Sequence, residues 1–298
     1  MGFLWGIDLG GTKIEAVVLP EGEGTASICR IRIPTEADRG YEHIIGQIAR
    51  LVEQVESHTG QSRPERIGIG TPGAADPATG LMKNCNTTSL NGRPLPTDLS
   101  KAIGVEAIVA NDANCFALAE ATLGAAAGAP VVFGVIMGTG VGGGLVVNGK
   151  VVGGAQGIAG EWGHNLLEPN GQPCYCGKRG CVETVLAGPF LERYYESLSG
   201  VRRHLREITE RTDTDIHAAA TLRRLYEKFG EGLSVVVNIV DPQVIVLGGG
   251  VGNIDGLYTH GRDELLRWIF NDHPRVDLRR PTLGDSAGVF GAAMLAKA

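Results

Sequence analysis

The 298-residue sequence contains no run of 18 consecutive apolar residues, so it offers no candidate for a transmembrane helix. It also has no basic segment, and its formal net charge is -6. An acidic chain of this kind gives no reason to expect nucleic acid or an anionic membrane as a partner. Because the first residues lack a basic stretch followed by a small-residue cleavage site, we expect no signal peptide and a cytoplasmic location.

The sequence has few cysteines, and half of them are clustered. Of the 6 cysteines, three are scattered and three lie close together at Cys174, Cys176 and Cys181. This spacing suits neither a disulfide framework nor a redox C-x-x-C pair. With His164 the cluster reads H-x9-C-x-C-x4-C, a ligand set typical of a structural Zn²⁺. We predict such a site, which would fix a loop rich in proline and glycine; the alternative is three buried thiols near a surface histidine.

Glycine, by contrast, is abundant and gathers in three places. The first is GIDLGGTK, where an apolar strand leads to Asp8 and the loop that follows contains Gly10, Gly11, Thr12 and Lys13. Successive backbone N–H groups in such a loop suit phosphate oxygens, and Asp8 suits Mg²⁺ through water. The motif is not a P-loop, because a second strand follows it. An ordinary glycine hairpin is the alternative.

The other two glycine clusters also follow predicted strands. GTGVGGG contains Gly138, Thr139 and Gly140, and we interpret it as a second phosphate loop because five glycines would weaken a strand without structural benefit. The alternative is a flexible hairpin tip. LGGGVGN contains Gly248, Gly249 and Gly250, where a backbone without side chains suits an adenosine moiety. A tight turn between strand and helix is the alternative there.

Polar residues at two further places are candidates for substrate chemistry. Asn111-Asp112 lies between a predicted strand and helix, where either residue would serve as a helix N-cap. Asp112 is also suited to accept the proton of an attacking hydroxyl in phosphoryl transfer. Glu161 and Glu183 flank the cysteine cluster, and carboxylates suit the hydroxyl groups of a sugar. Two solvated surface acids are the alternative.

The order of elements indicates a duplicated α/β unit facing a central cleft. Apolar runs and turn signals predict strands at 3–8, 13–19, 66–70, 107–110, 131–137, 244–247 and 277–283. Helical periodicity predicts helices near 41–58, 113–123, 189–199, 216–240, 256–270 and 286–297.

Seven ordered motifs, GIDLGGTK, GIGTPGAADPATG, ANDANCFALAEA, GTGVGGG, GEWGH, CYCGKRGC-x-E and VLGGGVGN, resemble those of the ROK sugar kinases across nearly the whole chain. The resemblance implies an actin-like ATPase fold with two ribonuclease-H-like domains. The small α/β domain would comprise 1–113 plus 284–298, and the large domain 114–283 with the zinc loop. It also implies ATP and Mg²⁺ as cofactors and a homodimer.

The resemblance also implies roles for single residues. Asp112 matches the catalytic base, and the three glycine clusters match the ATP motifs. The sugar-contacting positions would be Gly73, Asn111, Glu161, His164 and Glu183. His164 would then bind zinc through one ring nitrogen and a sugar hydroxyl through the other. The family usually has Ser-Gly where this chain has Ala187-Gly188.

Within the family, Asn86–Ser100, Gly160–Asn165 and Gly284–Ala293 are most similar to bacterial fructokinases, so fructose is the predicted sugar. Mannose, glucose and N-acetylglucosamine are the alternatives. A transcriptional repressor of the family would need an N-terminal helix-turn-helix. In this sequence, the strand that leads to the first predicted phosphate loop already lies within the first ten residues. A non-catalytic sugar sensor is a third class, against which Asp8, Asp112 and both glycine loops argue.

Overall fold

The computed structural model describes residues 2–22 and 24–297, and Met1, Glu23 and Ala298 lie outside the description. The chain forms two compact units. The first comprises 1–128, 144–159 and 282–298, and the second 129–143 and 160–281. The domain boundary near residue 113 remains a prediction; it lies at the start of helix α3, which falls in the first unit.

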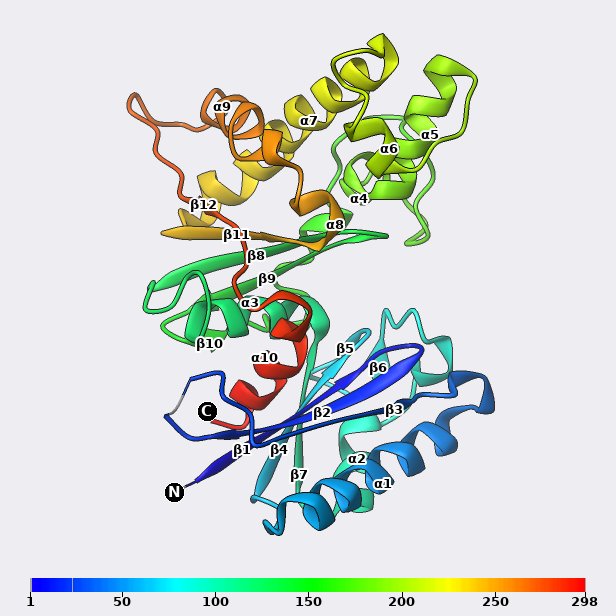
Figure 1. Cartoon of the computed structure of the whole chain (residues 1–298), viewed down its shortest axis with the longest axis vertical. Coiled ribbons are helices and arrows are strands. Elements are labelled where there is room, and N and C mark those ends of the chain that lie inside the picture. The colour runs from blue at the N-terminus through cyan, green and yellow to red at the C-terminus, as the bar shows by residue number, and fades with distance from the viewer. Residues whose placement is uncertain (1, 23, 298) are drawn as a thin grey trace. The chain divides into compact units, whose positions relative to one another are not determined.

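The first unit is built on a five-stranded sheet in the order β3-β2-β1-β4-β7 (Figure 1). The pairs β1–β2 and β2–β3 are antiparallel, whereas β1, β4 and β7 run parallel. The strands are β1 (Phe3–Leu9), β2 (Lys13–Pro20), β3 (Cys29–Pro34), β4 (Arg66–Thr71) and β7 (Glu106–Asn111). A short hairpin of β5 (Ala74–Ala75) and β6 (Met82–Lys83) follows β4.

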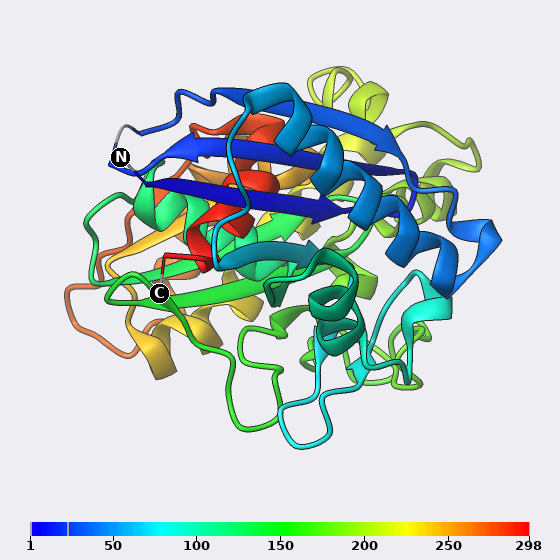
Figure 2. The ribbon, with the colours of Figure 1, turned by 90° about the horizontal axis from the view of Figure 1, so that it is seen from below.

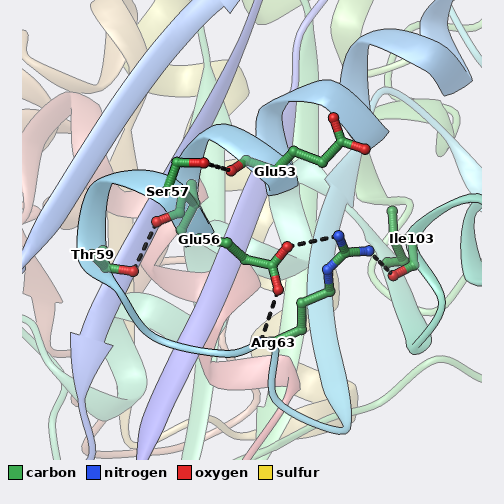
Figure 3. A network of polar contacts seen from close by, with 7 residues as sticks. Glu53, Glu56, Ser57, Thr59, Arg63 and Ile103 are labelled. Carbon is green, nitrogen blue, oxygen red and sulfur yellow. Dashed lines mark hydrogen bonds and ion pairs between the residues drawn. The ribbon is translucent and has the colours of Figure 1, made fainter.

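Helices α1 (Tyr41–Thr59) and α2 (Leu95–Ile103) cover one face of this sheet. Figure 2 shows α1, in blue, lying across the blue strands. Its apolar residues recur every three to four positions, so one stripe is buried: Ile44, Ile48, Leu51, Val52 and Val55. Arg63 joins the ends of the two helices, because its guanidinium donates to Glu56 Oε2 and to the Ile103 carbonyl, each at 2.6 Å (Figure 3).

Helices α3 (Asp112–Thr122) and α10 (Ala287–Leu295) pack together, and α10 also packs on β1 and β4. Glycine makes this approach possible. A Cβ atom on Gly68 would collide with the Ala292 carbonyl, and one on Gly291 would collide with the Cys115 carbonyl. Backbone therefore packs directly against backbone, and residues from both ends of the sequence share one core.

The second sheet has the order β10-β9-β8-β11-β12. Strands β8 (Val131–Met137), β11 (Val244–Gly248) and β12 (Leu278–Arg279) are parallel, and β9 (Val141–Val147) pairs antiparallel with β10 (Lys150–Val151). Numbered along the chain, each sheet has the strand order 3-2-1-4-5. This repetition confirms the predicted duplication of a ribonuclease-H-like unit.

The second unit also contains six helices among its described residues: α4 (Glu183–Leu186), α5 (Gly188–Ser199), α6 (Leu205–Thr209), α7 (Ile216–Val240), α8 (Gly249–Gly252) and α9 (His260–Leu266). Short 3₁₀ turns occur in the chain at η1 (Ala37–Arg39), η2 (Thr88–Leu90), η3 (Trp162–His164), η4 (Asp255–Leu257) and η5 (Gly284–Ser286). Among the described residues, no helix combines the length and apolar character needed to cross a membrane.

Two predicted elements differ from the structure. The helix expected at 256–270 is divided into η4 and α9, because Thr259 leaves the helical region with φ −115° and ψ −85°. The strand expected at 277–283 ends at Arg279. Pro281 follows closely and has no backbone N–H for a continued ladder.

Candidate active site and metal centre

Three parallel strands of the first unit bring predicted site residues to one edge of the sheet. Asp8 on β1 is level with Gly70 on β4, and Thr71 is level with Asn111 on β7. Asp112 follows as the first residue of α3. The carboxyl ends of β1, β4 and β7 therefore gather Asp8, Thr71, Asn111 and Asp112.

Asp8 lies in a recess that two glycines leave open. A Cβ atom on Gly70 would lie 3.4 Å from Asp8 Oδ1, and one on Gly288 would lie 3.3 Å from Oδ2. Burial, and then the negative charges of Asp112 and Glu15, raise the pKa of Asp8 to about 6. This influence of Asp112 shows that the structure brings together two carboxylates with different predicted roles.

Asn111, rather than Asp112, is the N-cap of α3. Asn111 Oδ1 accepts a hydrogen bond from Asn114 N–H at 2.8 Å, while Asp112 Oδ1 accepts one from the adjacent Ala113 N–H at 2.8 Å. Asp112 remains accessible to solvent, but the surrounding protein displaces much of the bulk water, and this desolvation raises the pKa of its carboxyl group. The capping explanation therefore applies to Asn111.

The loop from Gly10 to Lys13 is a tight hairpin supported from behind. Gly10 N–H donates to the Lys13 carbonyl at 3.0 Å, so it is used within the hairpin. Thr35, which is fully buried, donates from Oγ1 to the Gly10 carbonyl at 2.7 Å and from N–H to the Thr12 carbonyl at 3.0 Å. Gly11, Thr12 and Lys13 remain exposed. The sequence analysis did not identify Thr35, which lies beyond two strands.

Gly73 has a steric reason to be glycine. A Cβ atom there would lie 2.5 Å from Cys85 Sγ and 2.6 Å from the Lys83 carbonyl. Thr71 Oγ1 also donates to the Gly73 carbonyl at 2.8 Å, which fixes the turn after β4. Packing alone therefore accounts for this glycine, and its contact with a sugar stays a prediction.

In the second unit, the loop Gly138–Gly140 is fixed by Glu183. Glu183 Oε2 accepts a hydrogen bond from Val141 N–H at 3.0 Å, and a Cβ atom on Gly140 would lie 2.7 Å from the same oxygen. Gly138 N–H donates to the Gly140 carbonyl at 2.9 Å, and the Gly138 carbonyl accepts from Gly188 N–H at 2.8 Å. Glu183 is buried, so it is not a solvated surface acid.

The expectation that all glycines of GTGVGGG serve a loop is wrong, because β9 begins at Val141. Gly143 and Gly144 lie within the strand and have a packing role. A Cβ atom on Gly143 would lie 2.6 Å from the Gly160 carbonyl, and one on Gly144 would lie 2.6 Å from the Ala113 carbonyl. Close backbone approach is the structural benefit that the sequence pattern did not reveal.

The third glycine cluster forms a tight junction between β11 and α8. Gly249 has φ +80°, and a Cβ atom there would collide with the Met137 carbonyl. Gly249 and Gly250 are exposed, whereas Gly248 is the buried last residue of the strand. The turn interpretation is confirmed, and adenosine binding remains a prediction.

The predicted metal ligands are assembled as a compact group. The ligand atoms of His164, Cys174, Cys176 and Cys181 lie within 4.8 Å of one another. His164 Nδ1 is 3.6 Å from Cys174 Sγ, and Cys176 Sγ is 3.6 Å from Cys181 Sγ. A tetrahedron with Zn–S bonds of about 2.3 Å and Zn–N bonds of about 2.0 Å has edges of about 3.5–3.8 Å. The donor set and its spacing therefore fit a tetrahedral metal.

The metal loop also has backbone support of its own. Isolated bridges pair Leu166 with Cys181 and Pro173 with Arg179. Cys174 N–H donates to the Lys178 carbonyl at 2.8 Å, which closes the turn around Gly177. The loop is therefore less dependent on the metal than its composition predicts.

Tyr175, which the sequence analysis overlooked, contacts the metal-binding histidine. Its hydroxyl lies 3.0 Å from His164 Nε2, and the two rings meet edge to face with centroids 5.2 Å apart. Partial displacement of water around the hydroxyl, followed by the negative charges of Glu183 and Glu161, raises the pKa of Tyr175 to about 12, so the hydroxyl keeps its proton although most of the side chain is exposed. One predicted sugar-contacting residue, His164, therefore contacts this hydroxyl directly. In the sequence, only the position of Tyr175 between two cysteines could have indicated it.

Comparison with known proteins agrees with this organisation. The ROK family model matches residues 4–298. The N-acetyl-D-glucosamine kinase of Pasteurella multocida is 35% identical, over 98% of each chain. The structure of a ROK hexokinase from Thermus thermophilus is 35% identical with a TM-score of 0.89, covering 99% of this chain and 98% of that one.

A ROK glucokinase from Streptomyces griseus, solved with glucose and AMPPNP, is 29% identical with a TM-score of 0.79, and the match covers 99% of each chain. These relatives confirm the actin-like ATPase fold predicted from the motifs. They do not support the finer resemblance to fructokinases. The relative from Pasteurella multocida is named an N-acetyl-D-glucosamine kinase, and N-acetylglucosamine is one of the alternative sugars in the sequence analysis. The chain belongs to the ROK family.

Proposed function

We propose that this ROK-family protein, an ATP-dependent sugar kinase, transfers the γ-phosphoryl group of ATP to N-acetyl-D-glucosamine. The observation that carries the choice of sugar is the 35% identity to an N-acetyl-D-glucosamine kinase over 98% of both chains. Glucose is the second candidate, because the hexokinase structure has the same identity and the glucokinase structure contains glucose. Fructose, the sugar predicted from sequence, serves as a comparison in the test.

In the proposed reaction, Asp112 orients the attacking sugar hydroxyl and accepts its proton. The first turn of α3 and the Ala113 N–H fix one carboxylate oxygen, which leaves the other to face a substrate. Desolvation makes the charged carboxylate a stronger acceptor than it would be in water, as its raised pKa indicates. Positioning and electrostatics of this kind supply most of the rate in phosphoryl transfer.

ATP and its Mg²⁺ are assigned to Asp8 and to the three glycine clusters. Asp8 would hold Mg²⁺ through water, and the exposed residues Gly11, Thr12 and Lys13 would donate to phosphate oxygens. The loop Gly138–Gly140, fixed by Glu183, offers a second set of donors. The exposed glycines Gly249 and Gly250 leave room for adenosine. Bound Mg²⁺ would neutralise charge that develops on the phosphates.

We assign sugar contacts to Gly73, Asn111, Glu161, His164 and Glu183, as the family resemblance implies. Zinc is assigned to His164, Cys174, Cys176 and Cys181. A bound Zn²⁺ would supply no step of the reaction; it would fix the imidazole ring and the loop that carries these residues. The homodimer and the cytoplasmic location stay predictions.

The test is ADP release from Mg-ATP by the purified protein, with N-acetylglucosamine, glucose, mannose, fructose and N-acetylmannosamine at matched concentrations. We expect the highest kcat/KM with N-acetylglucosamine. Preference for glucose would select the second candidate, and preference for fructose would restore the sequence prediction. A folded, zinc-loaded protein that turns over none of these sugars would contradict the proposed substrate class.

A further inference from the structure

The Tyr175 hydroxyl lies at the one nitrogen of His164 that a metal would leave available. His164 Nδ1 faces Cys174 Sγ at 3.6 Å, and Nε2 faces the Tyr175 hydroxyl at 3.0 Å. A metal on Nδ1 would take that lone pair, so the ring proton would reside on Nε2. Nε2–H would then donate to the Tyr175 oxygen.

A phenolic hydroxyl and a sugar hydroxyl are equivalent partners for this N–H. Each has one O–H donor and oxygen lone pairs that accept. The negative charges of Glu161 and Glu183, which are the acceptors proposed for the sugar, also raise the pKa of the Tyr175 hydroxyl. On His164 Nε2, the tyrosine thus makes the contact that a bound hydroxyl would make.

Moving Tyr175 away would disturb little else. The residue is 75% exposed, so its displacement uncovers little apolar surface. Gly177, two residues later, has φ +86° in the tight turn of the loop. The side chain can rotate into water while Cys174 and Cys176 keep their places.

We propose that Tyr175 occupies the place of a sugar hydroxyl on His164 in the sugar-free protein, and that the sugar must displace it to bind. This inference rests on the proposed function, because it requires a sugar at His164. Tyr175 therefore competes with the substrate, and it favours sugars whose hydroxyl can replace the phenol on Nε2–H.

The test compares wild type, Tyr175→Phe and Tyr175→Ser in calorimetric titrations with the best sugar of the panel, without nucleotide. Removing one competing hydrogen bond should lower the sugar Kd by about threefold to tenfold in both variants. KM for the sugar should fall similarly, while kcat changes by less than about twofold. The zinc content of both variants should equal that of wild type.

A second readout follows the side chain itself. In protein labelled with 3-fluorotyrosine, the ¹⁹F signal missing from Tyr175→Phe belongs to Tyr175, and it should shift when sugar is added. Tyr194→Phe is the matched control, because Tyr194 lies in the same unit with Arg224 over its ring. Its sugar Kd should equal that of wild type.

Weaker or unchanged sugar binding in both variants, with zinc retained, would overturn the inference. Weaker binding would mean that Tyr175 helps to hold the sugar. Sugar binding by both variants but not by wild type would give the strongest support for competition between Tyr175 and the sugar. If no form of the protein binds any sugar of the panel, the proposed function fails first, and the inference fails with it.

Discussion

Glu183 Oε2 accepts a hydrogen bond from the buried N–H of Val141 at 3.0 Å, while Oε1 lies 4.0 Å from Cys174 Sγ. One buried carboxylate thus contacts both the Gly138–Gly140 loop and the metal cluster. Its two oxygens therefore have different surroundings. Glu183 therefore links two features that the sequence presents as separate motifs.

Glu183→Ala should leave the Val141 N–H buried without an acceptor. We expect the free energy of unfolding to fall by about 1–3 kcal/mol and the KM for ATP to rise as the loop loosens. Urea denaturation and initial rates measure the two effects. Glu183→Gln keeps a carbonyl acceptor and should lose less stability, so equal losses in both variants would contradict this role.

Asp112→Asn removes the proton acceptor but keeps the shape of the side chain. Turnover should fall by about a hundredfold or more, because general bases typically contribute that much or more. The sugar Kd should stay within about tenfold of wild type. Asp38→Asn, which changes an exposed acid in the same unit, is the control and should keep full turnover. Near-normal turnover in Asp112→Asn would exclude Asp112 as the base.

The raised pKa of Asp8 predicts that the free energy of unfolding depends on pH. Its pKa is raised from 3.8 to about 6 on folding, so the folded state holds the proton more tightly between these values. The free energy of unfolding therefore falls as pH rises through this window, by at most about 3 kcal/mol. Below the window both states are protonated and the cost disappears.

Asp8→Asn should relieve this cost. Without added magnesium, the variant should be more stable than wild type at about pH 8 and similar to it at about pH 4, while its use of Mg-ATP declines. Urea denaturation of both proteins at the two pH values measures the difference. A gain of the same size at both values would mean that the carboxylate charge is not its cause.

Cys176→Ser should remove one of four metal ligands. We expect elemental analysis to find about one zinc ion per chain in wild type and far less in the variant, with a lower melting temperature. Sugar affinity should fall with zinc content, because we assign His164 to both proposed sites. Cys29→Ala, outside the cluster, should retain zinc. A zinc-free protein with unchanged sugar affinity would show that sugar binding does not depend on zinc.

Local patterns predicted those parts of the fold whose causes are local. Helix α7 has the predicted bounds, because Asp215 Oδ1 caps its start by accepting from His217 N–H at 2.8 Å and Asp241 ends it with φ +46°. The spacing of His164 and the three cysteines likewise predicted a cluster that the structure assembles.

Long-range packing could not be predicted in this way. Gly143 and Gly144 are explained by the carbonyls of Gly160 and Ala113, which the sequence alone does not place beside them. The sequence also gave no direction for the Tyr175 side chain, which the structure turns toward His164. The preferred sugar depends on pocket shape, and motif similarity did not determine that shape.

The packing of α10 on β1 and β4 has a consequence for biosynthesis. The ribosome synthesises β1 first and α10 only after the whole second unit. The face of the first sheet that α10 covers therefore stays exposed during most of translation. Contacts between such distant segments form slowly. The second unit can therefore fold on the nascent chain, while the core of the first unit is completed only after α10 has been synthesised.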